Sequence, residues 1–488
     1  MKPSIHFSDI DFLNSPLSRE PGNSLQQQLY SRIKNAILDG KLKPGSRLPG
    51  TRKVGETLNI GRNTVIIVYE LLTSEGFLIS DNTGTRISNN YPESGTSPAH
   101  LPEAIKESIT SPVEGTEITQ QVINSAFFPG IPALNIFPHN EWRRAESRAS
   151  RKAGFTILNY GLPDGEPALK QAVASYLATS RGVNCTPEQI ILSSGLHKTL
   201  QICLAPITQK GDRVWVENPG YEFAKSPFRN AGLNIFPIKV DRDGINPTQE
   251  MWQNFPPKVI YLTPSSQYPT GARLSLERRI DIINNAIKYN TIVIEDDYGG
   301  EFPNPGPQLI SLQGMNNQAS VIYIGSFSQM MFPALRVGFA VLPSALLGPV
   351  SESLLTQPHG GNRLAQLTLT EFIESGRFIR HINKMSKAYQ DKRKKLIRAI
   401  KKSLHCAYEI TGQQVGTQLT LNLPADIDDV QLVAQAQQHG INMLPLSRFR
   451  ADDTVEANGL LIGYANTPTD LYDTYMRRID KLIAEQQE

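Results

Sequence analysis

The chain has 488 residues, of which 39% are hydrophobic and 19% are charged, and its formal net charge is +3. This composition is ordinary for a globular protein and leaves room for two or three domains. The sequence has no apolar run of the roughly 18 residues that a membrane span needs and no signal-peptide pattern, so we expect a cytoplasmic protein without a membrane partner. Three scattered cysteines suit a reducing compartment, and no CxxC or HExxH spacing indicates a metal site.

Changes in composition divide the chain into four parts. Residues 1–23 are interpreted as an arm, and residues 89–122, rich in Ser, Thr, Pro and Glu, as a flexible linker. Residues 24–88 have a helical pattern and carry nine Lys and Arg against five Asp and Glu, so this part is expected to meet a polyanion. Residues 123–488 alternate apolar runs with amphipathic helices, which predicts an α/β domain, with a smaller α+β subdomain at about 378–488.

The pattern of the helical part predicts a winged helix-turn-helix. The expected elements are a helix capped by Ser24 and stopped at Asp39-Gly40, a helix capped by Thr51 and reaching Leu58, a helix from Arg62 to Glu75, and hairpin strands Phe77–Ile79 and Thr85–Ile87. Two helices joined by a tight turn and followed by a hairpin are the layout of this motif.

Polar residues in this part are placed for DNA. Arg62, Asn63 and Thr64 begin the third helix, whose N-terminal turn enters the major groove, where Arg bonds guanine and Asn bonds adenine. The residues expected at phosphates and in the minor groove are Arg47, Arg52, Thr85 and Arg86. Charge alone is equally consistent with a three-helix surface of solvated side chains.

A resemblance favours the DNA-binding interpretation. The segment that carries it is KLKPGSRLPGTRKVGETLNIGRNTVIIVYELLTSEGFLIS, which resembles the GntR-type winged helix along its full length. The resemblance implies a double-stranded DNA operator as partner. One departure is Gly61, where the family usually has a Ser or Thr that caps the third helix.

The larger domain is expected to alternate strands with helices, as in an α/β protein. Its predicted strands are Ile190–Ser193, Arg213–Val216, Asn234–Pro237, Val259–Leu262, Ile292–Ile294 and Val321–Ile324, with Thr417–Leu423 and Leu460–Tyr464 in the smaller subdomain. After the sixth strand, Ser326, Ser328 and Arg336 have the residue types of an anion-binding turn. Free backbone N–H groups are expected to face an anion at a helix start formed by Gly195, Leu196 and His197.

Other side chains follow the strands, at the edge of the sheet where ligands of open α/β sheets gather. Tyr221 follows a Pro-Gly turn, where its ring can stack on a flat cofactor, and Gln267 supplies an amide. Asp296 can hold the proton of a pyridine nitrogen, and Tyr298 can bond a ring hydroxyl. Each feature taken singly is more often structural.

Six segments in this order resemble the fold-type I aminotransferase domain of the MocR subfamily of GntR transcriptional regulators. They are NYGLPDGEPALKQAVASYLATSRGV, ILSSGLHKTL, VWVENPGY, LTPSSQYPTGARLS, IVIEDDYGGEF and YIGSFSQMMFPALRVGF. The resemblance implies a multidomain fold, with a winged helix-turn-helix before an α/β fold-type I pyridoxal-phosphate-dependent transferase-like domain. It also implies a homodimer of head-to-tail, domain-swapped type.

The resemblance further implies pyridoxal phosphate contacts. Tyr221 would stack on the pyridine ring, Asp296 would pair with its nitrogen and Tyr298 with its phenolic oxygen. The phosphate would be held by Ser326, Ser328 and Arg336.

The departures from this family cluster in the pocket. Gln329 stands where the family has the lysine that forms a Schiff base with pyridoxal phosphate, and an amide nitrogen is not a nucleophile. Ser266 replaces a usual His, and Leu460 and Leu461 lie near a position at which carboxylate-binding members can carry Arg. Both a natural and an engineered origin of Gln329 are consistent with the sequence.

These observations predict a DNA-binding regulator whose aminotransferase-like domain senses a small-molecule effector and is not an enzyme. Three ligand states fit the pocket: non-covalent pyridoxal phosphate, its amine form or an amino-acid adduct, or an unrelated molecule. The alternatives are a pyridoxal-phosphate-dependent enzyme with an accessory DNA-binding domain, and a ligand-free DNA-binding protein whose large domain only dimerises.

Overall fold

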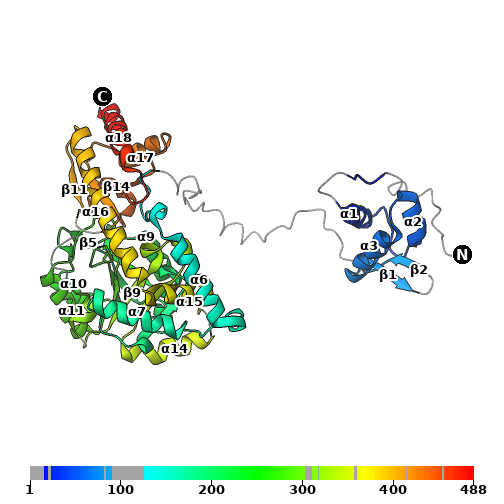
Figure 1. Cartoon of the computed structure of the whole chain (residues 1–488), viewed down its shortest axis with the longest axis horizontal. Helices are drawn as coiled ribbons and strands as arrows, with labels where there is room; N and C mark the ends of the chain where they lie inside the picture. The colour runs from blue at the N-terminus through cyan, green and yellow to red at the C-terminus, as the bar shows by residue number, and fades with distance from the viewer. Residues whose placement is uncertain are drawn as a thin grey trace. The chain divides into compact units, whose positions relative to one another are not determined.

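The structure is a computed structural model, which describes residues 16–19, 24–81, 84–90, 126–302, 310–316, 318–356, 360–413, 416–452 and 455–487. Most of the predicted arm and linker lies outside these ranges. The chain divides into two compact units, Met1–Gly115 and Thr116–Glu488 (Figure 1). In the described part of the chain, no helix has the length and apolar character needed to cross a membrane.

The first unit has the elements of a winged helix. They are helices α1 Leu25–Leu38, α2 Thr51–Leu58 and α3 Arg62–Ser74, and strands β1 Leu78–Asp81 and β2 Gly84–Ile87, which pair antiparallel. Leu29, Ile33, Val65 and Leu72 are fully buried, so the apolar faces of α1 and α3 form its core. Leu17, from the segment that precedes α1, also packs into this core.

Helix caps in this unit differ partly from the prediction. The Ser24 hydroxyl accepts a hydrogen bond from the Gln27 backbone N–H at 3.1 Å, as predicted for an N-cap. Thr51 is not a cap, because it is the first residue of α2 and Gly50 holds the cap position. Gly61 is the N-cap of α3 without a side-chain bond, so the N–H groups of the first turn of α3 gain no capping hydroxyl.

The second unit is built on an eight-stranded sheet of order β3-β10-β9-β8-β7-β4-β5-β6. Its strands are β3 Ile190–Ser193, β4 Arg213–Asn218, β5 Asn234–Asp241, β6 Gly244–Ile245, β7 Val259–Leu262, β8 Ile292–Asp296, β9 Val321–Ser326 and β10 Gly338–Val341. Strands β9, β8, β7, β4 and β5 are parallel, so their carboxyl ends share one edge of the sheet. All six strands predicted for this part are present, and four of them run two to four residues further.

Strand β10 was not predicted. It pairs antiparallel with both β3 and β9 and so lies between two strands that are parallel to each other. The short run GFAV has no alternating pattern, because both of its faces are buried. Its place in the sheet is therefore set by pairing and not by local sequence.

Helices cover both faces of this sheet. They are α6 His139–Ala153, α7 Pro167–Ser180, α8 Leu196–Leu204, α9 Glu222–Asn230, α10 Gln249–Asn254, α11 Leu276–Tyr289, α12 Leu312–Met315, α13 Phe327–Met330, α14 Leu347–Thr356, α15 Arg363–Glu374 and α16 Arg377–Ser403. Successive strand residues point to opposite faces: on β4, Val214 and Val216 pack with the cluster of α8 and α9, whereas Trp215 packs with that of α10 and α11.

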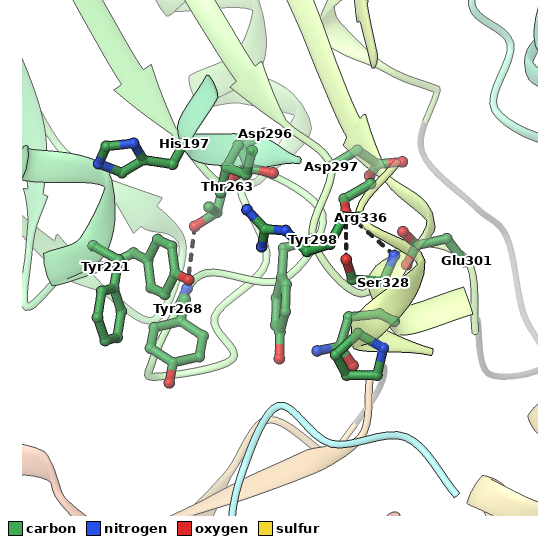
Figure 2. A pocket seen from close by; sticks show the side chains of 15 residues that line it. His197, Tyr221, Thr263, Tyr268, Asp296, Asp297, Tyr298, Glu301, Ser328 and Arg336 are labelled. Carbon is green, nitrogen blue, oxygen red and sulfur yellow. Dashed lines mark hydrogen bonds between the residues drawn. The ribbon is translucent and has the colours of Figure 1, made fainter. Parts of the chain in front are cut away.

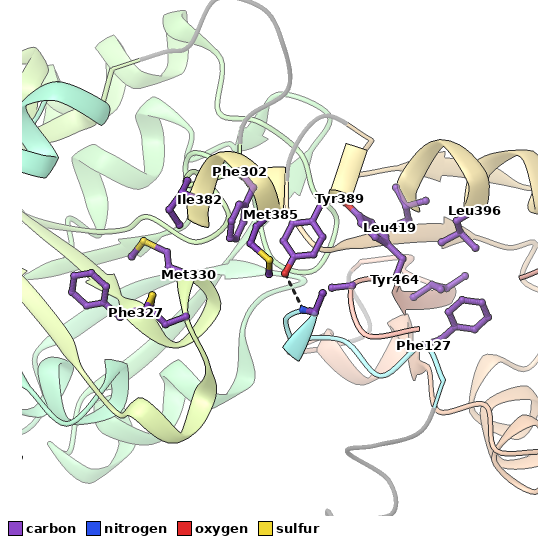
Figure 3. Packing of buried hydrophobic residues seen from close by; sticks show 14 of the residues in the cluster. Phe127, Phe302, Phe327, Met330, Ile382, Met385, Tyr389, Leu396, Leu419 and Tyr464 are labelled. Carbon is purple, nitrogen blue, oxygen red and sulfur yellow. Dashed lines mark hydrogen bonds between the residues drawn. The ribbon is translucent and has the colours of Figure 1, made fainter. Parts of the chain in front are cut away.

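A smaller antiparallel sheet, of order β11-β12-β14-β13, forms the predicted C-terminal subdomain. Its elements are β11 Glu409–Thr411, β12 Gln418–Asn422, α17 Asp429–Gln437, β13 Leu444–Pro445, β14 Gly459–Gly463 and α18 Tyr472–Gln487. Figure 3 shows how α16 joins the two parts: Met385 and Tyr389 lie beside Phe302, and Leu396 lies near Leu419 of β12. One continuous core thus connects the large domain with the subdomain.

Candidate functional site

The start of helix α3 is one candidate site, for DNA. Arg62 and Asn63 are exposed and Thr64 is half-buried in the first turn of α3. The Arg62 Nε lies 3.4 Å from the Thr51 hydroxyl, which it contacts as a hydrogen-bond donor. The predicted base-reading residues therefore lie together at the open end of the helix.

The predicted phosphate contacts are partly engaged within the protein. Arg52 forms an exposed ion pair with Glu56 at 3.2 Å. Arg86 Nε lies 3.8 Å from Asp81 across the hairpin, and Thr85 lies on the same strand. Arg47 forms a backbone bridge with Arg86, and its guanidinium lies against Gly84, where a Cβ atom would come within 2.8 Å of it. Arg47 thus lies beside Arg86 of the wing.

A cavity of about 340 Å³ opens at the carboxyl ends of the parallel strands. Figure 2 shows Asp296, Tyr298 and Arg336 around one space, with Tyr221 on one side and Glu301 on the other. The side chains that line it are Leu196, His197, Tyr221, Phe223, Thr263, Tyr268, Asp296, Asp297, Tyr298, Glu301, Ser326, Ser328, Gln329, Pro333 and Arg336. The structure thus brings together nine of the eleven residues that the sequence predicts for a cofactor.

One end of the cavity is suited to an anion. The Ser326 hydroxyl accepts a hydrogen bond from the Ser328 backbone N–H at 3.2 Å, and the two hydroxyls are 3.1 Å apart. Arg336 is in the left-handed region, with φ of 51°, and forms no hydrogen bond or ion pair with the described residues through its guanidinium. A Cβ atom at Gly195 would lie 3.3 Å from that guanidinium, so this glycine leaves Arg336 close to the start of α8 although it does not line the cavity itself.

Asp296 lies at the end of β8, deep in the cavity. It accepts a hydrogen bond from the Tyr261 hydroxyl at 2.5 Å. Burial raises the pKa of this carboxyl to about 7, and the charge of Asp297 adds to the effect. A carboxyl of this kind can share a proton with a basic ring nitrogen.

Aromatic rings form a second wall. The rings of Tyr221 and Tyr268 are 5.0 Å apart, and those of Tyr268 and Tyr298 are 5.4 Å apart, both edge to face. The Tyr298 hydroxyl donates to Gln418 of β12 at 3.1 Å, so this tyrosine also joins the cavity to the subdomain. Tyr268 was not predicted, although it lies in the segment LTPSSQYPTG.

Gln267 was predicted to contact the cofactor, and the structure does not support this role. Its side chain is 2% exposed and donates to the carbonyl oxygens of Pro219 at 2.9 Å and Tyr268 at 2.6 Å. Its amide also contacts the buried carboxylate of Glu217. The residue braces two loops because its amide is used entirely within the protein.

A buried ion pair supports the floor of the cavity. Arg181 bonds both carboxylate oxygens of Asp297 at 2.6 Å, and the Tyr323 hydroxyl donates to Asp297 at 2.5 Å. Burial opposes ionisation of Asp297, but the adjacent guanidinium outweighs it and holds the pKa of this carboxyl below its usual value. Asp297 and Glu301 were not predicted as cavity residues, although both lie in the segment IVIEDDYGGEF.

Gln329 lines the cavity, and a hydrogen bond to the backbone of another segment fixes its side chain. Its amide nitrogen donates to the Gly130 carbonyl oxygen at 2.7 Å. The positions noted as departures in the subdomain are apolar: Leu460 and Leu461 are fully buried, and Leu461 packs with Tyr268 and Phe449. Ser266 is buried behind the cavity and does not line it.

Comparison with known families and structures gives two family matches. Residues 132–479 match the model for aminotransferase class I and II, and residues 25–87 match the model for bacterial regulatory proteins of the gntR family. The chain is 32% identical over 456 residues to the probable rhizopine catabolism regulatory protein MocR of Rhizobium meliloti, which covers 92% of each chain. It is 33% identical over 432 residues to the HTH-type transcriptional regulator YdeL of Bacillus subtilis, with 88% of this chain and 91% of the relative covered.

Among solved structures, the fold is similar to that of the α-aminoadipate aminotransferase LysN from Thermus thermophilus. The TM-score is 0.69 at 24% identity, over 77% of this chain and 96% of the other. This likeness establishes a fold-type I aminotransferase architecture for the second unit.

We expect Asp297→Asn to lower the free energy of unfolding of the second unit by about 3–5 kcal/mol, because it leaves the buried Arg181 without a counter-charge. All three tryptophans, Trp142, Trp215 and Trp252, lie in this unit, so their fluorescence during urea unfolding measures the change. The control is Asp391→Asn, which breaks an exposed ion pair with Lys395 and should cost less than about 1 kcal/mol. Equal losses in the two variants would contradict the structural role of the buried pair.

Proposed function

Because the chain belongs to the MocR-type regulators, which join a gntR-family winged helix to an aminotransferase class I and II domain, we propose that a small molecule bound in its cavity controls its binding to a DNA operator. The winged helix supplies DNA recognition through the exposed start of α3. The observation that carries the proposed sensing role is that the anion-binding end of the cavity has Gln329, and not an amine, after Ser328.

The residues of the cavity fit a pyridoxal-type phosphate. Arg336 and the hydroxyls of Ser326 and Ser328 would hold a phosphate, and the N-terminus of α8 adds backbone donors. Asp296 would hold the proton of the ring nitrogen, and the ring of Tyr221 would cover one face. Such a ligand supplies an aldehyde or amine at its reactive carbon. The crystal structure of LysN contains N-(5'-phosphopyridoxyl)-L-leucine, and its fold is shared.

The residue after Ser328 decides how the ligand is held. Gln329 has no free amine, so this position cannot form a covalent bond to an aldehyde. The protein would therefore hold its ligand by charge, hydrogen bonds and stacking alone, and would lack transaminase activity.

An exposed apolar segment supports a homodimer. Phe155 and Leu158 are each 86% exposed and Tyr160 is 98% exposed, which is unusual for neighbouring large apolar side chains. Arg363 holds this segment in place through the carbonyl oxygens of Thr156 and Asn159. A second copy of the chain would cover this surface, and we propose the head-to-tail, domain-swapped arrangement that the family resemblance implies.

For DNA, we expect Arg62→Ala to weaken operator binding by roughly 1–3 kcal/mol and to relax base preference, because it removes a base contact. Fluorescence anisotropy at fixed salt, with an operator selected from random DNA and with scrambled DNA, measures both effects. Arg52→Ala is the control, which should weaken both complexes similarly because it removes a phosphate contact. Equal weakening of both complexes by Arg62→Ala would count against base reading.

For the cavity, we expect Gln329→Lys to bind pyridoxal phosphate covalently, because it restores an amine after Ser328. Intact mass after borohydride reduction should show one added phosphopyridoxyl group per chain in this variant only. Gln329→Met is the control and should gain no mass. A borohydride-stable adduct on the unmodified protein would instead favour the alternative of a pyridoxal-phosphate-dependent enzyme.

For the dimer, we expect Leu158→Asp to convert the full-length protein from a dimer to a monomer, because a charge would be buried without a partner in the interface. Light scattering coupled to gel filtration measures the mass. Val430→Asp changes a similar side chain on α17, which is 56% exposed, and should leave the mass unchanged. A dimer that persists in Leu158→Asp would place the interface elsewhere.

A further inference from the structure

Two buried oxygen atoms on the cavity wall have no hydrogen-bond donor among the described residues. They are Oε2 of Glu301 and Oε1 of Gln329, and both side chains line the cavity. Glu301 is 9% exposed. Buried acceptors of this kind are costly unless a donor reaches them, so their donor is expected to come from a ligand.

The orientation of the Gln329 amide is fixed by its other contact. The Gly130 carbonyl accepts a hydrogen bond at 2.7 Å and cannot donate one, so the Gln329 NH₂ group must face it. The amide oxygen is then directed away from Gly130. Because Gln329 directly follows Ser328, this oxygen is close to the anion-binding turn.

Glu301 forms no ion pair with any of the described residues, although the charge of nearby Arg181 acts to lower its pKa. The nearby guanidinium of Arg181 is used by Asp297, by the Gly300 carbonyl and by the Ser265 hydroxyl. Among the described residues, the other groups that interact with Glu301 are Asp296, Asp297 and Tyr298 on the β8 side and Tyr176 of α7, none of which is a cation. Burial, and then the charge of Asp297, raise the pKa of Glu301 to about 8.

The charge pattern argues against a ligand with a carboxylate at this wall. Of the described residues that line the cavity, Arg336 alone is a lysine or arginine, and it lies at the anion-binding turn. Leu461 of the subdomain, near the position at which carboxylate-binding members can carry Arg, is an uncharged, buried side chain. A ligand carboxylate beside Glu301 would therefore find no lysine or arginine as counter-charge among the described lining residues.

We propose that Glu301 and Gln329 form an ammonium site, so that the effector is a phosphorylated pyridoxamine-type amine and not the corresponding aldehyde or an amino-acid adduct. This inference rests on the proposed function of the cavity. The phosphate would lie at Arg336 and the ammonium at the two unpartnered acceptors. A charged donor satisfies both oxygens and supplies the missing counter-charge of Glu301.

The test compares three probes on the full-length protein: pyridoxamine 5′-phosphate, pyridoxine 5′-phosphate and pyridoxal 5′-phosphate. The first two differ only in an ammonium or a hydroxyl on the same carbon. We expect isothermal titration to show pyridoxamine 5′-phosphate binding roughly 10- to 100-fold more tightly than pyridoxine 5′-phosphate. In Glu301→Gln this ratio should fall to about 1, with the affinity for pyridoxine 5′-phosphate unchanged.

Glu295→Gln is the matched control. Glu295 is a buried glutamate on β8 that accepts the Leu312 and Gln313 backbone N–H groups and does not line the cavity, so its replacement should keep the ratio. If Glu301→Gln does not fold, Gln329→Met provides the second variant, which should reduce the ratio severalfold through loss of the amide oxygen.

The outcomes distinguish a failure of the ammonium site from a failure of the proposed function of the cavity. Equal affinities for the amine and the alcohol in the unmodified protein would overturn the ammonium site and leave the cavity as a phosphate-binding site. A ratio that persists in folded Glu301→Gln, or is untouched in Gln329→Met, would likewise overturn it. Binding of none of the three phosphates would overturn the proposed function itself.

Discussion

The cavity at the carboxyl ends of the parallel strands depends on one buried guanidinium. Arg181, which follows α7, bonds Asp297 and Gly300 after strand β8 and Ser265 after strand β7. A buried charge is tolerated only when it is fully paired, so these contacts must form together. One side chain thereby fixes the loops at the carboxyl ends of two neighbouring strands, and with them Asp296 and the other acidic residues of the cavity.

The end of strand β8 and the segment after it contain three buried carboxyl groups, those of Asp296, Asp297 and Glu301. Their charge environments differ. The Arg181 guanidinium is bonded to Asp297 and holds its pKa below the usual value, whereas it is not bonded to Asp296 or Glu301, whose pKa values rise to about 7 and about 8. Burial alone would raise all three, and the placement of Arg181 produces the difference. The cavity therefore contains two carboxyl groups, Asp296 and Glu301, whose ionised form a cationic group of a bound ligand would stabilise.

Because Gln329 carries no amine, the proposed ligand would be held without a covalent bond to this position. A ligand held by charge, hydrogen bonds and stacking exchanges freely with its surrounding pool, so its occupancy follows its concentration. That property suits an effector site attached to a gntR-family winged helix. An aminotransferase-like fold can serve this purpose because its anion-binding turn and its nucleophile are separate side chains.

The sequence by itself determined the winged helix, the order of the strands along the chain and most cavity residues, because periodicity, turn residues and motif spacing are local properties. Only the tertiary structure decided which of the neighbouring residues line the cavity. Gln267 turns away to brace two loops, whereas Tyr268 and Glu301 line the cavity. Strand β10 and the contact of Gln329 with Gly130, 199 residues away along the chain, depend on strand pairing and long-range hydrogen bonds, which no local pattern encodes.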